Sequence, residues 1–134
     1  MNTENRIVLK DSAGKVLVIA EKGLVRITTT LVDETGTAIP SSAVSALTLT
    51  LYAQNEPNQD IINSVNGTDI LNTGRGTLHA TSGLLTVTLT GSDLTIINTG
   101  NDLEWHRALI QGTFSSKPFK CEIDFPVRNL DKVT

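Results

Sequence analysis

The sequence contains few cysteine and aromatic residues, which are among the residues from which a function could be inferred. It contains one cysteine, Cys121, so no disulfide can form within the chain. We expect Cys121 to behave as a small buried hydrophobe. Aromatic residues make up 4% of the 134 residues. This scarcity makes a carbohydrate-binding or adhesion module the less favoured alternative, because such modules usually present several exposed rings to sugars.

Long apolar runs and targeting signals are also missing. No run approaches the roughly 18 apolar residues of a membrane-spanning helix, so we expect no association with a membrane. Residues 1–5 are polar and lack the charged-then-apolar pattern of a secretory signal. The sequence thus indicates a protein that is made and assembled in a cytoplasm.

Charged residues of both signs are spread along the chain. The 11 Lys and Arg residues are outnumbered by 14 Asp and Glu residues, which gives a formal net charge of −3. No basic block offers the clustered positive charge that nucleic acids require, so we expect no nucleic-acid partner.

No spacing of residues predicts catalysis or metal binding. His79 and His106 lie in different predicted strands, and no further ligands are spaced to join them. Gly74-Arg75-Gly76 lacks the Lys-Ser/Thr of a phosphate-binding loop and predicts a tight turn. One loop has side chains that could surround Ca²⁺, although not with EF-hand spacing: Asp93, Asn98, Asn101 and Asp102. We expect a protein that is not an enzyme and that has no cofactor and no metal site.

The clearest feature of the sequence is that apolar residues recur at every second position in several segments. Between residues 119 and 127, apolar residues alternate with Lys120, Glu122 and Asp124, which predicts a strand with one buried and one wetted face. The same alternation recurs in residues 24–32, 47–52, 85–90 and 104–114, and no segment has a sustained helical period. The pattern predicts an all-β fold, an antiparallel Ig-like β-sandwich, although the Cys-Trp-Cys core of antibody domains is missing.

Threonine occupies the non-core side of the predicted strands, at Thr28, Thr30, Thr48, Thr50, Thr86, Thr88 and Thr90. Such faces carry little charge, so a neighbouring subunit could cover them at a small desolvation cost. An ordinary solvated sheet face is the alternative.

The first part of the chain differs from the rest. Residues 1–23 contain two β-prone runs around a predicted turn at residues 11–14, and we interpret them as an N-terminal arm or edge hairpin. Residues 24–134 form the predicted β-sandwich domain. The second run, Val16-Leu17-Val18-Ile19, is apolar on both faces, so either the domain or another chain must cover one of them.

In the connection between the predicted strands, either Thr68 or Asp69 is placed to cap one helical turn.

One cluster of residues is typical of an interface. If His106 faces the core, then Trp105 and Arg107 face outward, and these two residue types often anchor protein contacts. The alternative is that Trp105 packs beneath a neighbouring loop. The predicted interface residues are therefore Val16, Leu17, Val18, Ile19, Trp105 and Arg107.

Several segments resemble the small Ig-like virion structural proteins of tailed bacteriophages. They are Val32-Asp33-Glu34-Thr35-Gly36, Leu49-Thr50-Leu51-Tyr52, Ile61-Ile62-Asn63, Asp69-Ile70-Leu71-Asn72-Thr73-Gly74, Gly83-Leu84-Leu85-Thr86-Val87-Thr88-Leu89, Glu104-Trp105-His106-Arg107-Ala108-Leu109-Ile110 and Glu122-Ile123-Asp124-Phe125-Pro126-Val127-Arg128-Asn129-Leu130. The resemblance implies a structural subunit located in the virion, most directly a capsid decoration or cement protein. Its partners would be the major capsid protein or other virion proteins, and further copies of itself in a homo-oligomer. A head–tail connector of the neck or a baseplate adaptor is the alternative within this class.

Overall fold

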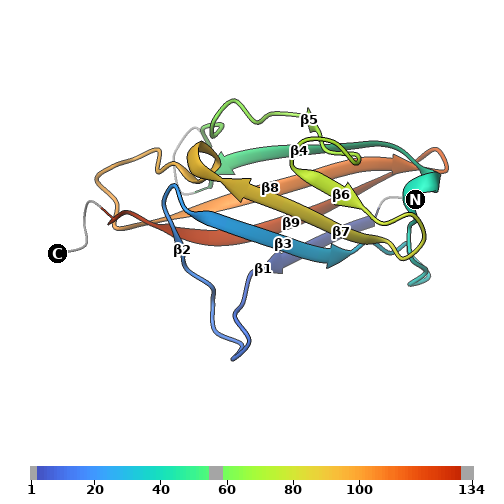
Figure 1. Cartoon of the computed structure of the whole chain (residues 1–134), viewed down its shortest axis with the longest axis horizontal. Coiled ribbons are helices and arrows are strands. Elements are labelled where there is room, and N and C mark those ends of the chain that lie inside the picture. Colours follow the sequence, from blue (N-terminus) through green and yellow to red (C-terminus); the bar gives the residue numbers. More distant parts are fainter. Residues whose placement is uncertain (1–2, 55–58, 131–134) are drawn as a thin grey trace.

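The structure of the chain, a computed structural model, describes residues 3–54 and 59–130, with side chains from residue 8 onward (Figure 1). Its elements are β1 (Thr3–Val8), β2 (Ile19–Ala20), β3 (Leu24–Thr30), the 3-10 helix η1 (Ser41–Ala43), β4 (Val44–Ala53), β5 (Thr68–Asp69), β6 (Gly76–Leu78), β7 (Leu84–Thr90), the 3-10 helix η2 (Gly91–Leu94), β8 (Leu103–Phe114) and β9 (Lys117–Arg128). In the described part of the chain, no helix is long and apolar enough to cross a membrane.

The strands form two sheets that pack face to face. The larger sheet has the order β1-β9-β8-β4-β5, with β2 also paired to β9, and the smaller sheet has the order β3-β7-β6. Figure 1 shows the smaller sheet lying over the larger one, with the strands of both running along the long axis of the molecule. The prediction of an all-β sandwich is confirmed.

The core lies between the sheets and follows the predicted alternation. Inward-facing residues of both sheets are buried in one cluster, which includes Val25, Ile27, Leu47, Leu49, Leu51, Leu85, Val87, Leu89, Ala108, Ile110, Phe119, Cys121, Ile123, Phe125 and Val127. The threonines predicted on the opposite faces are exposed or half-buried. Asp124 is an exception, because it is buried although the alternation predicts a wetted side chain.

Most of the segment predicted as an arm or edge hairpin lies on the sandwich itself. β1 pairs in parallel with residues 119–124 of β9, and β2 pairs in parallel with Val127 and Arg128. Both strands therefore add to the same edge of β9, and Ile19 is buried in the core. Between them the chain leaves the sheet as a hairpin, which Figure 1 shows projecting from the body.

The segment around Thr68 differs from the prediction of a capped helical turn. Thr68 and Asp69 pair with β4 as the two-residue strand β5. The Asp69 carboxylate accepts a hydrogen bond from the N–H of Leu71 at 3.0 Å. This is the local contact that Asp makes in a turn, and it competes with helix formation.

Cys121 is buried in the core, and this burial raises the pKa of its thiol to about 11, with a smaller contribution from Glu122. We expect a thiol reagent at pH 8 to label the folded protein at least about a hundredfold more slowly than the urea-unfolded chain, because thiolate is the reacting species. Equal labelling rates in the folded and unfolded chains would contradict the buried position.

Candidate interaction surface

The outer face of the larger sheet holds the two predicted anchors of β8. Tyr52 of β4 lies opposite Arg107, and Arg107 lies opposite Asp124 of β9, so these side chains form one row across three strands. Sequence alternation correctly predicts that Trp105 and Arg107 share this face, because His106 between them is buried on the other side.

Arg107 uses its donors within the chain. Its Nε donates to Asp124 Oδ1 at 2.6 Å and Nη2 to Asp124 Oδ2 at 3.1 Å, while Nη1 donates to the Tyr52 hydroxyl at 3.2 Å. Nη2 also donates to Gln54 Oε1 at 3.1 Å. The hydrogen bond to Asp124 is the largest cause that raises the pKa of Arg107. With its side chain only 12% exposed, Arg107 holds β4, β8 and β9 together and is poorly placed to bind a partner.

The same bidentate pair explains why Asp124 is buried. A carboxylate can be buried on a strand face when an arginine binds both of its oxygens. On the remaining side of β9, β1 continues the sheet past Asp124. The alternation alone could not predict the burial of Asp124. It indicates which face a residue lies on, but it does not show that a long side chain on the neighbouring strand covers that residue.

Trp105 has a different environment from Arg107. It is half-buried and lies opposite Pro126 of β9. Val18 comes directly before Ile19, whose partner Val127 comes directly after Pro126. Val18 and Trp105 are therefore separated by one strand on the same face of the sheet.

The structure divides the run Val16 to Ile19 between inside and outside. Ile19 is buried and Leu17 packs partly against the core, whereas Val16 is 43% exposed and Val18 is 40% exposed. Leu103, also exposed, follows the same alternation on β8 as Trp105. We name Val16, Val18, Leu103 and Trp105 the Val–Trp patch; sequence reasoning missed Leu103, although its place in the alternation with Trp105 could have revealed it.

The hairpin that carries Val16 is closed by hydrogen bonds within its own turn. The Asp11 carboxylate accepts hydrogen bonds from the N–H groups of Ala13 and Lys15 at 2.9 and 3.0 Å. Below the turn, the N–H of Leu17 donates to the Leu9 carbonyl at 3.0 Å, and Lys10 pairs with Val16. Gly14 at φ +83° supplies the left-handed residue that the turn requires.

A second polar cluster lies inside the sandwich, and sequence reasoning did not find it. The side chains of Glu104 and His106 are fully buried, and their Oε1 and Nε2 atoms are 2.7 Å apart. The same carboxylate accepts the N–H groups of Ile97 and Asn98, both at 2.8 Å. Desolvation acts to raise the pKa of Glu104, but these hydrogen bonds outweigh it and lower the pKa. The pair thus fixes the loop before β8 from inside the core.

Three other polar residues that the sequence singled out, His79, Arg75 and Asp93, have structural contacts. His79 Nδ1 accepts N–H groups of the turn at Thr81 and Ser82. Arg75 binds both carboxylate oxygens of Asp93, at 2.7 and 2.8 Å, so Asp93 is not free for a cation. Among the described residues, no three His, Cys, Asp or Glu side chains come together as a possible metal site.

The predicted interface residues thus fall into two groups. Val18 and Trp105 share the outer face of the larger sheet and Val16 is exposed on the hairpin, whereas Leu17, Ile19 and Arg107 contribute to the fold. Comparison with models of known protein families finds no match, and no curated protein or solved structure matches the chain significantly.

Proposed function

We propose that the chain is a non-enzymatic structural protein of a bacteriophage virion, and within that class a capsid decoration or cement protein that stabilises the head. Its partners are then the major capsid protein and further copies of itself. The observation that carries the proposal is the projecting hairpin, which exposes Val16 at its side and leads into Val18, exposed on the same face of the larger sheet as Trp105. A projecting apolar surface suits docking onto another protein, whereas small-molecule sites are concave.

The order of the strands supports the resemblance from which the proposal starts. The smaller sheet joins β3, β7 and β6, and the larger sheet places β9, β8 and β4 side by side. If β3 is lettered B and the two-residue strand β5 is left out of the lettering, these are the groups B-E-D and G-F-C, which correspond to the two sheets of an Ig-like sandwich. The chain reaches this arrangement without the Cys-Trp-Cys core.

The Val–Trp patch gives a direct test by binding to particles assembled without the protein. We expect Val18→Asp and Trp105→Ala each to weaken binding about tenfold or more, because each change removes apolar contact area from the centre of the surface. Leu84→Asp is the matched control, since Leu84 is equally exposed but lies on the smaller sheet. Unchanged binding of both patch variants would contradict the assignment of this surface.

Electron microscopy of the native particle tests the location. A decoration protein appears as repeated density on the capsid lattice, and its removal should lower the temperature at which the heads break. Density confined to the neck or the baseplate would replace the proposal by the connector or adaptor alternative. Absence of the protein from the particle would overturn both.

A further inference from the structure

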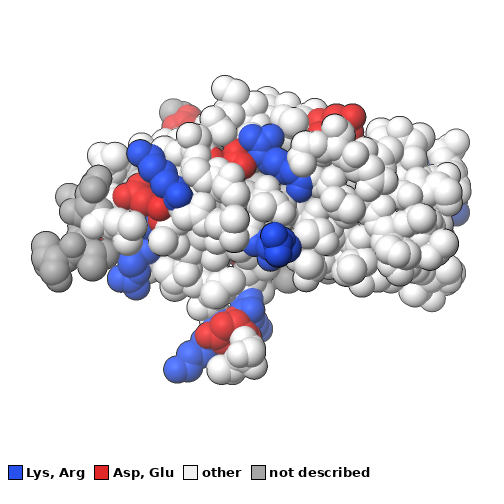
Figure 2. All heavy atoms as spheres, in the orientation of Figure 1, with Lys and Arg blue, Asp and Glu red and all other residues white. Residues whose placement is uncertain are grey.

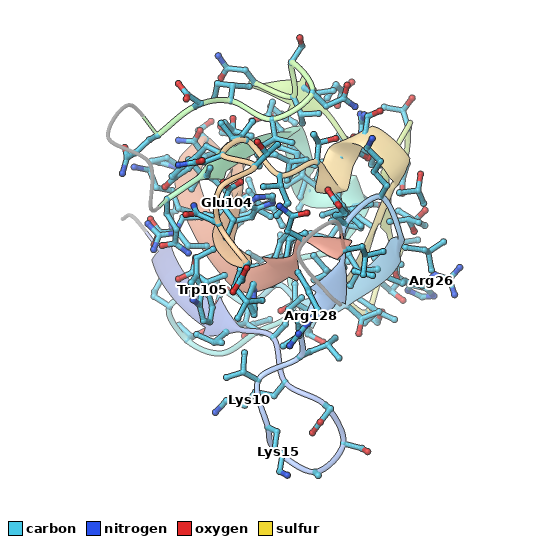
Figure 3. The ribbon with its side chains drawn as sticks, turned by 90° about the vertical axis from the view of Figure 1, so that its left-hand side faces the viewer. Lys10, Lys15, Arg26, Glu104, Trp105 and Arg128 are labelled. Carbon is cyan, nitrogen blue, oxygen red and sulfur yellow. The ribbon has the colours of Figure 1, made fainter. Side chains whose placement is uncertain are left out.

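The hairpin carries a charge that differs in sign from that of the whole chain. Figure 2 shows it projecting from the body, with basic atoms on either side of an acidic group. Lys10 and Lys15 are exposed on the hairpin, and Asp11 is its one acidic residue. Arg128 lies opposite Ala20, where β2 follows the hairpin along β9. Figure 3 shows Lys10, Lys15 and Arg128 on this side of the molecule, with Arg26 pointing away on another side.

Among the described residues, Lys10, Lys15 and Arg128 form no ion pair, whereas the carboxylate of Asp11 accepts hydrogen bonds within the turn of the hairpin. Arg75 pairs with Asp93, Lys117 pairs with Glu34, and Arg107 pairs with both Glu122 and Asp124. The Asp11 carboxylate points back into the turn, where backbone N–H groups bind it. With two lysines and one aspartate, the hairpin has a formal charge of +1, in a chain whose formal net charge is −3.

The free cations lie around exposed apolar side chains. Lys15 directly precedes Val16, and Lys10 pairs with Val16 across the hairpin. Val18 and Arg128 lie on the same outer side of the sheet edge, because their neighbours Ile19 and Val127 are both buried. We name this group, Lys10, Lys15, Val16, Val18 and Arg128, the hairpin surface.

We infer that the hairpin surface docks onto an acidic surface of a partner protein, with its two valines in an apolar hollow there. Lysine and arginine at the rim of an interface steer the approach of an acidic partner and fix its register, while the apolar centre supplies affinity. The turn contacts of Asp11 hold the hairpin in shape before binding, so little conformational freedom remains to be lost. That this partner is a capsid subunit rests on the proposed function, but the acidic character of the partner does not.

The first experiment measures binding of the full-length chain to particles assembled without it, at increasing salt concentration. We expect wild-type binding to weaken about tenfold between 50 and 300 mM salt, because salt screens rim charges. The double variant Lys10→Glu/Lys15→Glu should bind about tenfold more weakly at low salt. Arg26→Glu is the control, since Arg26 is also exposed and unpaired among the described side chains but lies away from the hairpin. It should change binding less than twofold.

A second experiment does not depend on the particle. The probe is a synthetic peptide of glutamates and leucines, titrated into the isotopically labelled protein and followed by NMR. We expect shifts confined to residues 9–18 and Arg128, and their loss in the double variant. The inference would be overturned if the peptide caused no shifts or shifts in other parts of the protein. It would also be overturned if the protein bound duplex DNA or vesicles of anionic phospholipid more tightly than the peptide.

The two experiments separate the two proposals. If Val18→Asp abolishes particle binding but the charge reversals and salt do not affect it, the acidic partner is wrong and the proposed function stands. If the wild type does not bind particles but the peptide maps to the hairpin surface, the proposed function is wrong and the acidic partner stands.

Discussion

Replacing Phe125 by alanine is expected to lower the free energy of unfolding by about 3–5 kcal/mol. Phe125 is fully buried in β9, and its ring lies edge-on to that of His106, with the centroids 5.9 Å apart. The truncation leaves a cavity between the two sheets that neighbours on paired strands cannot collapse to fill. Urea unfolding of the two proteins measures the difference.

Lys120→Ala on the opposite face of the same strand is the control for Phe125→Ala. It should stay within about 0.5 kcal/mol of the wild type, because a surface substitution removes little packing. If Lys120→Ala destabilises the chain more than Phe125→Ala does, the faces of β9 are assigned wrongly.

Glu104→Gln should destabilise the chain by about 2–4 kcal/mol, because a carboxamide oxygen cannot accept all three hydrogen bonds that the carboxylate accepts and a buried donor is left unpaired. Glu104 accepts the N–H groups of Ile97 and Asn98 and contacts His106 within the core. Equilibrium unfolding at pH 7 gives the loss.

The pH dependence identifies the charge of Glu104 as the cause. Its pKa is lower in the folded chain than the ordinary value of 4.5, so its carboxylate stabilises the fold fully above that pH. This stabilisation is lost as the pH falls from about 4.5 towards the lower folded-state pKa. The stability gap between wild type and Glu104→Gln should therefore narrow between pH 5 and pH 3. Asp93 and Asp33, whose pKa values are also lowered, act equally in both proteins. A gap that stays constant with pH would show that the charge of Glu104 contributes nothing.

The sequence predicts the faces of strands well, because burial on one face leaves a period of two that can be read residue by residue. Leu47, Leu49 and Leu51 are an example, all fully buried as the alternation indicates. The sequence does not predict which side chains and main-chain groups will contact one another. Glu104 and His106 share the inward alternation of β8, but their pairing depends on main-chain groups of a preceding loop whose path carries no periodic signal.

The same limit applies to the candidate site. The two-sided apolar run of Val16 to Ile19 correctly shows that a second surface must meet it. It does not show that Ile19 enters the core beside Val127 of β9 while Val16 and Val18 stay exposed. Arg107 faces outward as predicted, yet its partners Asp124 and Tyr52 lie 17 and 55 residues away in the chain. Such distant pairings appear only when the strands are assembled.

The parallel pairing of β1 and β2 with β9 has a consequence for how the subunit is made. β9 follows β1 and β2 by about a hundred residues, so these two strands have no edge to join until β9 itself has been synthesised. Pairing across such a sequence separation is slow, because a long loop must close before any contact forms. The hairpin between β1 and β2 therefore takes its final position last. A chain that lacks β9 therefore cannot hold the hairpin surface in its final position.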